Sequence, residues 1–390
     1  METTWAFDGK RYRMYRFADD INTEMKKLNR SDNWHSGVAW LIDIAWMALC
    51  AWLCLAVSWW FYPLAVLVIG ARQRGLSTIL HDCAHGSGAA NRRLQMLIGT
   101  VLTAYPIFQQ HYAYKLSHVF THHPALGNPE RDPDLRFFIQ QKAYEVASPR
   151  AYVRRIVLMP LFGTQTWAYL KYLVTNRYRM HKGRETQSSS GTRTLRRHKR
   201  VLDRLGFWAF WLVVAGVCWW QGWLPGLLLF WVVPYLTSFQ LLGWYIELSE
   251  HTPLVRDSNV DLYMTRNRKS RDWEKFLTGI HNDNYHLEHH LDPRTPFWNL
   301  GKARKARLAD PGYVAVDAVL GGLFTRGPQG QPSAMSAIVS SMTEPREQSR
   351  AVTPGKDLPA GRVRRHARGR RTAPGADRAG EHADLPDRRL

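Results

Sequence analysis

The sequence predicts an all-α integral membrane protein, in which four transmembrane helices form two hairpins that carry a cytoplasmic helical cap rich in histidine. Two observations lead to this prediction. The chain has two strongly apolar regions, at residues 38–80 and 207–246, and each is long enough for a helix to cross a bilayer and return. Outside them lie three histidine clusters whose spacing of three or four residues is that of one helix face.

The first hairpin begins with residues 38–57, which are apolar except for Asp43. About 20 residues make about 30 Å of helix, which is enough to cross a bilayer. The turn SWWFYP has aromatic residues and no Lys or Arg, which is typical of the interface on the outer side. The chain returns over residues 61–80, where Arg72 and Arg74 end the apolar core. We expect these arginines to reach the cytoplasmic interface while the helix continues into water.

The second hairpin comprises residues 207–220 and 224–244, and its turn QGWLP again lacks Lys and Arg. Between the hairpins, residues 94–108 are also apolar, but about 15 residues are too few to span a bilayer. A re-entrant or interfacial segment is therefore expected there. Both turns then point outward, all three histidine clusters lie on the cytoplasmic side, and the segment YIELSEH projects from the last span on that side.

The Lys and Arg residues indicate the orientation of the chain. The net charge is +21, and the basic residues collect beside the spans and near the C-terminus, without the motif of a nucleic-acid-binding protein. We expect both termini and the loop at residues 176–200 to be cytoplasmic, and the protein to lie in a bacterial inner membrane. No cleaved signal peptide is expected, and the four cysteines indicate no disulfide framework.

The composition divides the chain into three parts. Residues 1–36 are polar and basic and are expected to form a cytoplasmic N-terminal segment, followed by the membrane domain at residues 37–323 with its histidine clusters. Residues 324–390 are rich in Gly, Pro, Ser, Ala and Arg. Because they have too few apolar residues to bury a core, we predict a disordered basic tail.

The histidine clusters carry the chemistry of the sequence, and they read HDCAHG, HVFTHH and HNDNYHLEHHL. One HxxxH pair is often only a packed or exposed feature of a helix, but three clusters in one chain indicate a metal site. Eight imidazoles exceed the three or four that one zinc takes, and imidazole also suits iron, so we predict two metal ions. The eight imidazoles are those of His81, His85, His118, His122, His123, His286, His289 and His290.

The order HxxxH, HxxxHH, HxxHH, with apolar spans before the first cluster and between the second and third, resembles the membrane-bound fatty acid desaturases and their hydroxylase relatives. The resemblance covers residues 36–310 and includes the phrases HHPALGNPERDPD and NYHLEHHL. Those enzymes are non-haem di-iron proteins, so the resemblance implies two irons held by the eight histidines. It also implies a ninth ligand, His251, beyond the last span.

The resemblance further implies a polar partner four residues before that ninth ligand, where this chain has Glu247. An Asn-type partner that acts through water is expected of acyl-CoA desaturases, so a carboxylate there is a departure that would change the local charge. His281 lies five residues before the third cluster and could orient a neighbour. Further carboxylates could accept the second ring N–H of a ligand histidine, or belong to turns and solvated helix faces. They are Asp132, Asp134, Asp283 and Glu288.

Removing hydrogen from an unactivated C–H bond is beyond side-chain acids and bases, so O₂ chemistry at a metal is expected. The resemblance implies a desaturase that acts on a fatty acyl chain. The chain contains no haem or flavin motif, so the electrons would come from a separate donor. A basic cytoplasmic face would attract an acidic donor such as a ferredoxin.

Three alternatives to an acyl desaturase can be compared with the sequence, and the first two stay open. A hydroxylase or ketolase would share the same histidine clusters. The phrases EHTPL, TRNR and HNDNYHLEHHLDP are also similar to those of dihydrorhizobitoxine-type desaturases, which would mean a small, amino-acid-like substrate. A metal transporter is disfavoured, because it would carry ionisable residues inside its spans and the histidines here lie outside them.

Overall fold

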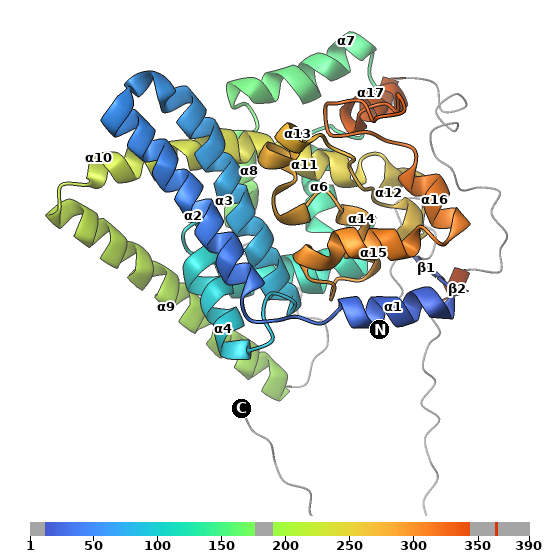
Figure 1. The fold of residues 1–390 in the computed structure, drawn as a ribbon, viewed down its shortest axis with the longest axis horizontal. Helices are drawn as coiled ribbons and strands as arrows, with labels where there is room; N and C mark the ends of the chain where they lie inside the picture. Colours follow the sequence, from blue (N-terminus) through green and yellow to red (C-terminus); the bar gives the residue numbers. More distant parts are fainter. Residues whose placement is uncertain (1–11, 176–189, 344–362, 366–390) are drawn as a thin grey trace, which may run out of the picture.

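The computed structural model describes residues 12–175, 190–343 and 363–365 (Figure 1). The regular secondary structure of these residues is helical with one exception, so the prediction of an all-α protein is confirmed. The exception is an antiparallel pair of three-residue strands, β1 (Arg13–Tyr15) and β2 (Val363–Arg365), in which Arg13 lies opposite Arg365.

The apolar regions of the sequence form the long helices of the molecule, together with one short helix between two of them. The first region folds into two helices that lie side by side, and the first of them continues as a π-helical turn to Val57 (Figure 1). The second region runs from one long helix through a short one and two π-helical turns to a third. These helices are α2 (His35–Trp52), α3 (Tyr62–His85), α9 (Ser190–Trp220), α10 (Leu224–Leu227) and α11 (Gln240–His251).

Among the described residues, three helical segments are long and apolar enough to cross a membrane, namely His35–Val57, His198–Trp220 and Leu224–Asp257. Helix α3 has the length for a fourth, but the sequence RQR in its middle lowers its hydropathy. Three of the four predicted spans are therefore candidates by length and composition.

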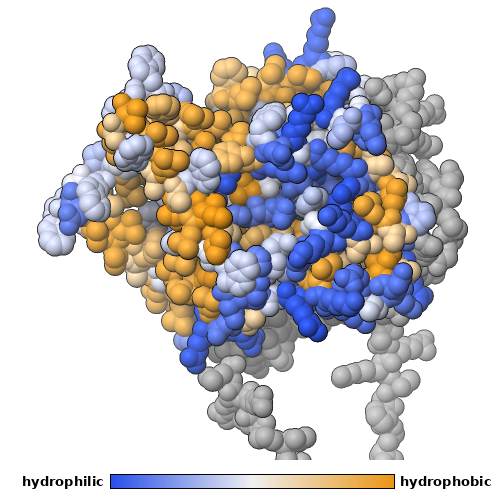
Figure 2. Space-filling view, viewed as in Figure 1, coloured by the Kyte–Doolittle hydropathy of each residue, from blue (hydrophilic) through white to orange (hydrophobic). Residues whose placement is uncertain are grey.

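The surface of these helices is apolar. Figure 2 shows hydrophobic side chains gathered over the α2, α3 and α9 side of the molecule, and hydrophilic side chains over the side formed by the shorter helices. Leu41 and Leu55 on the α2 segment, and Leu212 and Trp220 on α9, are more than half exposed. Exposing apolar surface to water is unfavourable by about 25 cal/mol per Å². Such a surface is that of a membrane protein.

The shorter helices build the hydrophilic side of the molecule together with 3₁₀ and π-helical turns. They are α1 (Asp19–Leu28), α4 (Arg92–Met96), α5 (His111–Ser117), α6 (Pro133–Gln140), α7 (Pro149–Tyr152), α8 (Thr166–Leu173), α12 (Leu254–Asp257), α13 (Asp272–Thr278), α14 (His286–Leu291), α15 (Leu300–Arg307), α16 (Pro311–Asp317) and α17 (Ala334–Thr343). The apolar stretch after α4 is a π-helical turn at Leu97–Ala104 that packs on α3 and is not one of the candidate spans.

A hydrophobic core surrounds α11 and holds the hydrophilic side together. Trp244 is 1% exposed, and its indole N–H donates to the carbonyl of Ile156 at 3.0 Å. Met335, Ile338 and Met342 of α17 belong to the same buried cluster. Helix α17 is therefore part of the folded domain.

Helix α17 corrects the predicted boundary of the disordered tail, because residues 324–343 are folded. The Gly- and Pro-rich stretch before α17 resembles a linker in composition. The sequence AMSAIVSSMT nevertheless has enough apolar residues to bury one face of a short helix against α11. The rest of the predicted tail, apart from β2, and residues 176–189 of the predicted loop lie outside the described residues. Residues 190–200 of that predicted loop are instead helical and form the start of α9.

Candidate metal centre

Four parts of the chain bring nine histidines together. Helix α3 carries His81 and His85 on its last turn, and α5 continues as a π-helical turn, His118–His122, that ends next to His123. The remaining rings come from α11 and α14, namely His251, His286, His289 and His290. All nine histidines that the sequence predicts as ligands therefore converge on one region.

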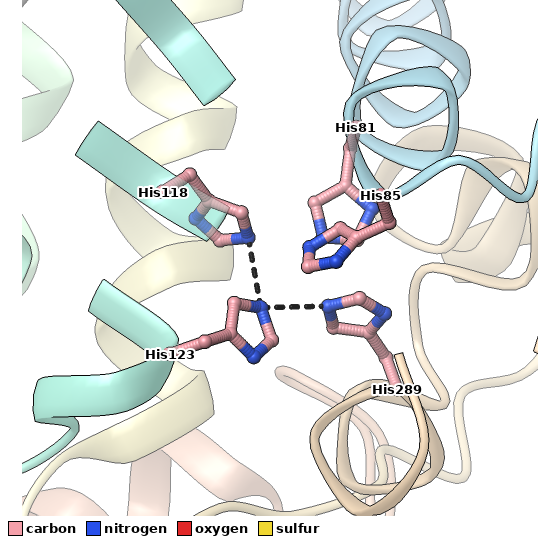
Figure 3. Close-up of side chains that lie close together, drawn as sticks. All are labelled: His81, His85, His118, His123 and His289. Atoms are coloured by element: carbon pink, nitrogen blue, oxygen red, sulfur yellow. Dashed lines mark hydrogen bonds between the residues drawn. The ribbon is translucent and has the colours of Figure 1, made fainter. Parts of the chain in front are cut away.

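Five of these rings form a first group. Figure 3 shows His81, His85, His118, His123 and His289 facing one another from α3, the turn after α5 and α14. One nitrogen of each ring lies within 4.8 Å of the chosen nitrogens of the others. The Nε2 atom of His123 is 3.2 Å from Nε2 of His118 and 3.0 Å from Nε2 of His289.

The other four rings form a second group beside the first. The side-chain atoms of His122, His251 and His290 lie within 4.8 Å of one another, and so do those of Glu250, His251 and His286. The Nε2 atom of His286 is 3.2 Å from Nε2 of His251 and 3.0 Å from Nε2 of His290.

Local helix geometry explains how adjacent residues reach different groups. His286 and His290 are four residues apart on α14 and share one face, whereas His289 is turned toward the first group. In the turn after α5 the wider π-helical winding lets His118 and His123, five residues apart, face the same group. His122 then faces the second group.

The buried nitrogens fit metal binding. Burial, and then neighbouring imidazoles, hold the pKa of His118, His123 and His289 well below the ordinary value. These rings are therefore neutral near pH 7, which is the form that binds a metal. The Nε2 atoms of His81 and His85 are buried and have no hydrogen-bond partner among the described residues. A metal ion would satisfy these otherwise costly groups.

Carboxylates hold several of the rings from behind. Asp132 accepts at 2.9 Å from Nδ1 of His122, and its other contacts cap α6, where it accepts from the backbone N–H of Asp134 at 3.0 Å. Glu250 lies 3.4 Å from Nδ1 of His286. A carboxylate at Nδ1 leaves Nε2 as the free nitrogen, which directs Nε2 toward a metal.

Several carboxylates act differently from the sequence prediction. Glu288 is fully buried, but its described partners are Arg307, Tyr313 and Asn267 rather than a ligand ring. The reason is helical geometry, since a residue two positions after His286 points away from the face that His286 occupies. Asp283 likewise pairs with Arg268 at 3.1 Å. Both residues anchor the third histidine cluster to the fold.

Of the two glutamates Glu247 and Glu250 on α11, Glu250 is the one that approaches the second group. Glu247 belongs to none of the candidate metal groups in the described chain, and it pairs with Arg74 at 3.0 Å. His281 lies 2.7 Å from the buried Asp43 of α2, so it joins the third cluster to the first span.

The sequence patterns assigned no role to Asp82 or Asp43, and they included Glu250 only within the segment YIELSEH that follows the last span. Asp82 lies 3.3 Å from Nδ1 of His81 and accepts from the backbone N–H of Phe297 at 2.6 Å. Asp43, the one charged residue in the first apolar span, did carry a signal, because a charge inside a span usually has a partner.

A cavity of about 970 Å³, including its opening to solvent, adjoins both groups, and His81, His118 and His251 form part of its wall. We call it the polar cavity, because its wall also has one arginine, five carboxylates and four tyrosines, beside three aliphatic side chains and the two phenylalanines Phe138 and Phe239. The charged residues are Arg74, Asp132, Asp134, Glu247, Glu250 and Asp283. The tyrosines are Tyr114, Tyr144, Tyr169 and Tyr172, and the aliphatic residues are Leu135, Leu173 and Val255.

The fold and the histidine groups agree with the comparison to protein families. The sequence profile of the family described as fatty acid desaturase matches residues 57–317. The chain therefore belongs to the fatty acid desaturase family, and it is an oxidoreductase.

Individual relatives differ in the substrates that their names state. The chain is 45% identical to dihydrorhizobitoxine desaturase of Bradyrhizobium elkanii over 347 residues, which are 89% of this chain and 96% of the relative. It is 30% identical to the sn-1 acyl-lipid omega-3 desaturase (ferredoxin) of Synechocystis sp., over 64% of this chain and 68% of the relative. Identity to the chloroplastic omega-6 fatty acid desaturase of Glycine max is 22%, over 74% of this chain and 66% of the relative.

Proposed function

We propose that this protein is an O₂-dependent desaturase that introduces a carbon–carbon double bond into a small, amino-acid-like substrate. The observation that carries the proposal is the polar cavity, whose wall joins the two histidine groups to six charged side chains. The balanced reaction removes two hydrogen atoms from the substrate. It reduces O₂ to two waters with two further electrons and two protons from an external donor.

We propose iron as the metal, with one ion in each histidine group. His81, His85, His118, His123 and His289 would hold the first, and His122, His251, His286 and His290 the second. Iron suits imidazole ligands, and when bound it would supply the O₂ activation that breaks an unactivated C–H bond. The chain contributes neutral rings, and carboxylates behind them that direct Nε2 inward.

The polar cavity favours a small polar substrate over an acyl chain. A pocket for a long hydrocarbon would be lined mainly by apolar side chains, because burying charged groups against it leaves them unsolvated. This wall has six charged side chains against five apolar ones, which are three aliphatic residues and two phenylalanines. The relative from Bradyrhizobium elkanii is named for dihydrorhizobitoxine, which supports the same choice.

An acyl desaturase is the second candidate, which the names of the relatives from Synechocystis sp. and Glycine max favour. The experiment that separates the candidates is expression in a bacterial host with a compatible reductase. Cells are given dihydrorhizobitoxine, and both the compound and the host lipids are analysed by mass spectrometry. Dihydrorhizobitoxine lacking two hydrogens supports the proposal. New unsaturated lipids without that product overturn it, and a product with one added oxygen indicates a hydroxylase.

We also propose that α3 is a fourth span, that the protein lies in the inner membrane, and that the histidine groups and both termini are cytoplasmic. The distribution of Lys and Arg around the apolar regions supports this orientation. A basic cytoplasmic face would attract an acidic electron donor, and the name of the Synechocystis relative points to a ferredoxin. A cysteine introduced at Ser188 should not react with a membrane-impermeant thiol reagent added outside the cell. Labelling at that position would contradict the proposed orientation.

A further inference from the structure

The polar cavity contains an ion pair that the histidine groups do not use. Nη1 of Arg74 on α3 lies 3.0 Å from Oε1 of Glu247 on α11, and the hydroxyl of Tyr169 donates to the same oxygen at 3.0 Å. The side chains of Arg74 and Glu247 are 13% and 26% exposed, and both line the polar cavity. Neither residue belongs to a candidate metal group in the described chain.

The Arg74–Glu247 pair still has hydrogen-bond donors that a ligand could use. An arginine has five N–H donors, and the Nε atom of Arg74 is buried without a hydrogen-bond partner in the described chain. Leaving such a group unsatisfied is unfavourable, and among the arginines with an unpaired Nε in the described chain Arg74 is the one that lines the polar cavity. A Cβ atom at Gly243 would lie 3.0 Å from Nη1 of Arg74. Because glycine has no Cβ atom, it leaves room for the guanidinium of Arg74 to pack beside α11.

The positions of these residues along the two helices give the distance between the ion pair and the histidines. Arg74 precedes His81 by seven residues of α3, so both lie on one helix face about 10 Å apart along its axis. Glu247 precedes His251 by four residues of α11, which is about 6 Å. The ion pair thus lies one to two helical turns from the ligand histidines, on both walls of one cavity.

We propose that Arg74 and Glu247 are specificity-determining residues that bind the charged head of a zwitterionic substrate. Arg74 takes the substrate carboxylate on its remaining N–H groups, and Glu247 takes the substrate ammonium on its carboxylate. The short carbon chain then extends toward His81 and His251. This inference rests on the proposed function, and it adds the residues, the orientation and the length of substrate that the cavity selects.

Charge balance supports this arrangement. A ligand with one carboxylate and one ammonium group adds no net charge to the cavity, and each of its charges meets an opposite one. Arginine presents a planar fork that matches a carboxylate in two hydrogen bonds, which a lysine cannot reproduce. An uncharged hydrocarbon would instead leave the free donors of Arg74 without an acceptor.

The test compares Arg74→Lys with Arg155→Lys, the same change at an arginine that pairs with the exposed Glu145 at 3.9 Å outside the cavity. Binding of dihydrorhizobitoxine to the iron-loaded protein is measured by calorimetry without O₂ or electron donor, and KM and kcat are measured in their presence. We expect Arg74→Lys to raise Kd and KM roughly 10- to 100-fold with little change in kcat. Arg155→Lys should change neither Kd nor KM.

A change in the ligand gives a second arm that does not depend on a folded variant. The wild-type protein should bind dihydrorhizobitoxine more tightly than its carboxamide, and Arg74→Lys should lose most of that preference. Equal binding of acid and amide by the wild type, or an unchanged Kd in Arg74→Lys, overturns the inference while turnover of dihydrorhizobitoxine preserves the proposed function. Wild-type activity on acyl lipids alone overturns the proposed function, and this inference with it.

Discussion

At the scale of single residues, the candidate metal centre depends on imidazoles that are kept neutral and whose Nε2 atoms are oriented toward one another. Burial holds the pKa of His286 and His290 well below the ordinary value, so both stay unprotonated near neutral pH. Glu250 behind His286 then leaves its Nε2 for the metal. A ligand histidine is thus defined by its surroundings as much as by its spacing.

Replacing His289 by alanine tests this at the first group. The change removes one of five rings and alters no apolar span, so membrane insertion should be retained. We expect less iron per chain and a loss of turnover greater than about 100-fold, because loss of an outer partner alone already costs 10- to 100-fold. Metal analysis and turnover measure the effect. The control is His198→Ala, which removes an exposed histidine of α9, and full iron content in His289→Ala would contradict the assignment.

The buried carboxylate of Asp261 gives a pH dependence that is separate from the metal. Burial raises its pKa from 3.8 to about 7, against the lowering effect of the backbone N–H groups of Tyr15 and Leu262. The folded protein therefore holds this proton more tightly than the unfolded chain does. Its contribution to stability is complete below about pH 4 and is lost as the pH rises through about 7, by no more than about 4 kcal/mol.

Thermal unfolding in detergent at about pH 5 and about pH 8 measures this contribution. Wild-type protein should lose more stability between the two conditions than Asp261→Asn, whose amide does not titrate and whose oxygen still accepts from the backbone. Equal losses in the two proteins would show that Asp261 is already ionised at the lower pH.

At the scale of elements, α14 has two working faces. His286, His289 and His290 point to the metal groups, and Glu288 points to α15 and α16, where Arg307 and Tyr313 hold it. One short helix is thereby fixed on one side and presents ligands on the other. The buried ion pair between Glu288 and Arg307 fixes the backbone of α14, and it thereby positions the three histidines without contacting their rings.

Glu288→Ala should destabilise the protein by about 3–5 kcal/mol, because it leaves the charge of Arg307 buried and unpaired. The double variant Glu288→Ala, Arg307→Ala removes both charges, so its loss should be smaller than the sum of the two single losses. Chemical unfolding of the three variants, with iron content as a second measurement, checks the coupling. Additive losses would mean that the two side chains do not stabilise each other.

At the scale of the whole molecule, an apolar side and a charged side meet at the metal centre. Helix α3 joins them, since its first half packs among the spans and its last turn carries His81 and His85. Helix α17 closes the charged side by packing against α11, whose own last turn carries His251. The end of the folded domain is therefore set by α17.

Truncation tests that boundary. Ending the chain after Thr343 keeps α17 and should preserve iron content and turnover, because the three-residue β1–β2 pair is too short to be stabilising on its own. Ending it after Leu323 removes Met335, Ile338 and Met342 from the core and should lower stability and iron content together. Size-exclusion profiles in detergent and metal analysis compare the two forms. If the two truncated forms had equal stability and iron content, the folded domain would end before residue 324, as the sequence predicted.

The sequence by itself determined the properties that depend on local spacing. The apolar runs predicted the helices of the membrane side, and the histidine spacing predicted eight of the nine rings that the structure brings together, because helical periodicity places such residues on one face. The ninth ring, that of His251, was expected only from the resemblance to the desaturase family. Only the tertiary structure decided how the rings divide into two groups, that Glu250 rather than Glu247 approaches them, and that α17 is folded. These features join residues far apart in the chain, and they depend on how whole helices pack, which no local period encodes.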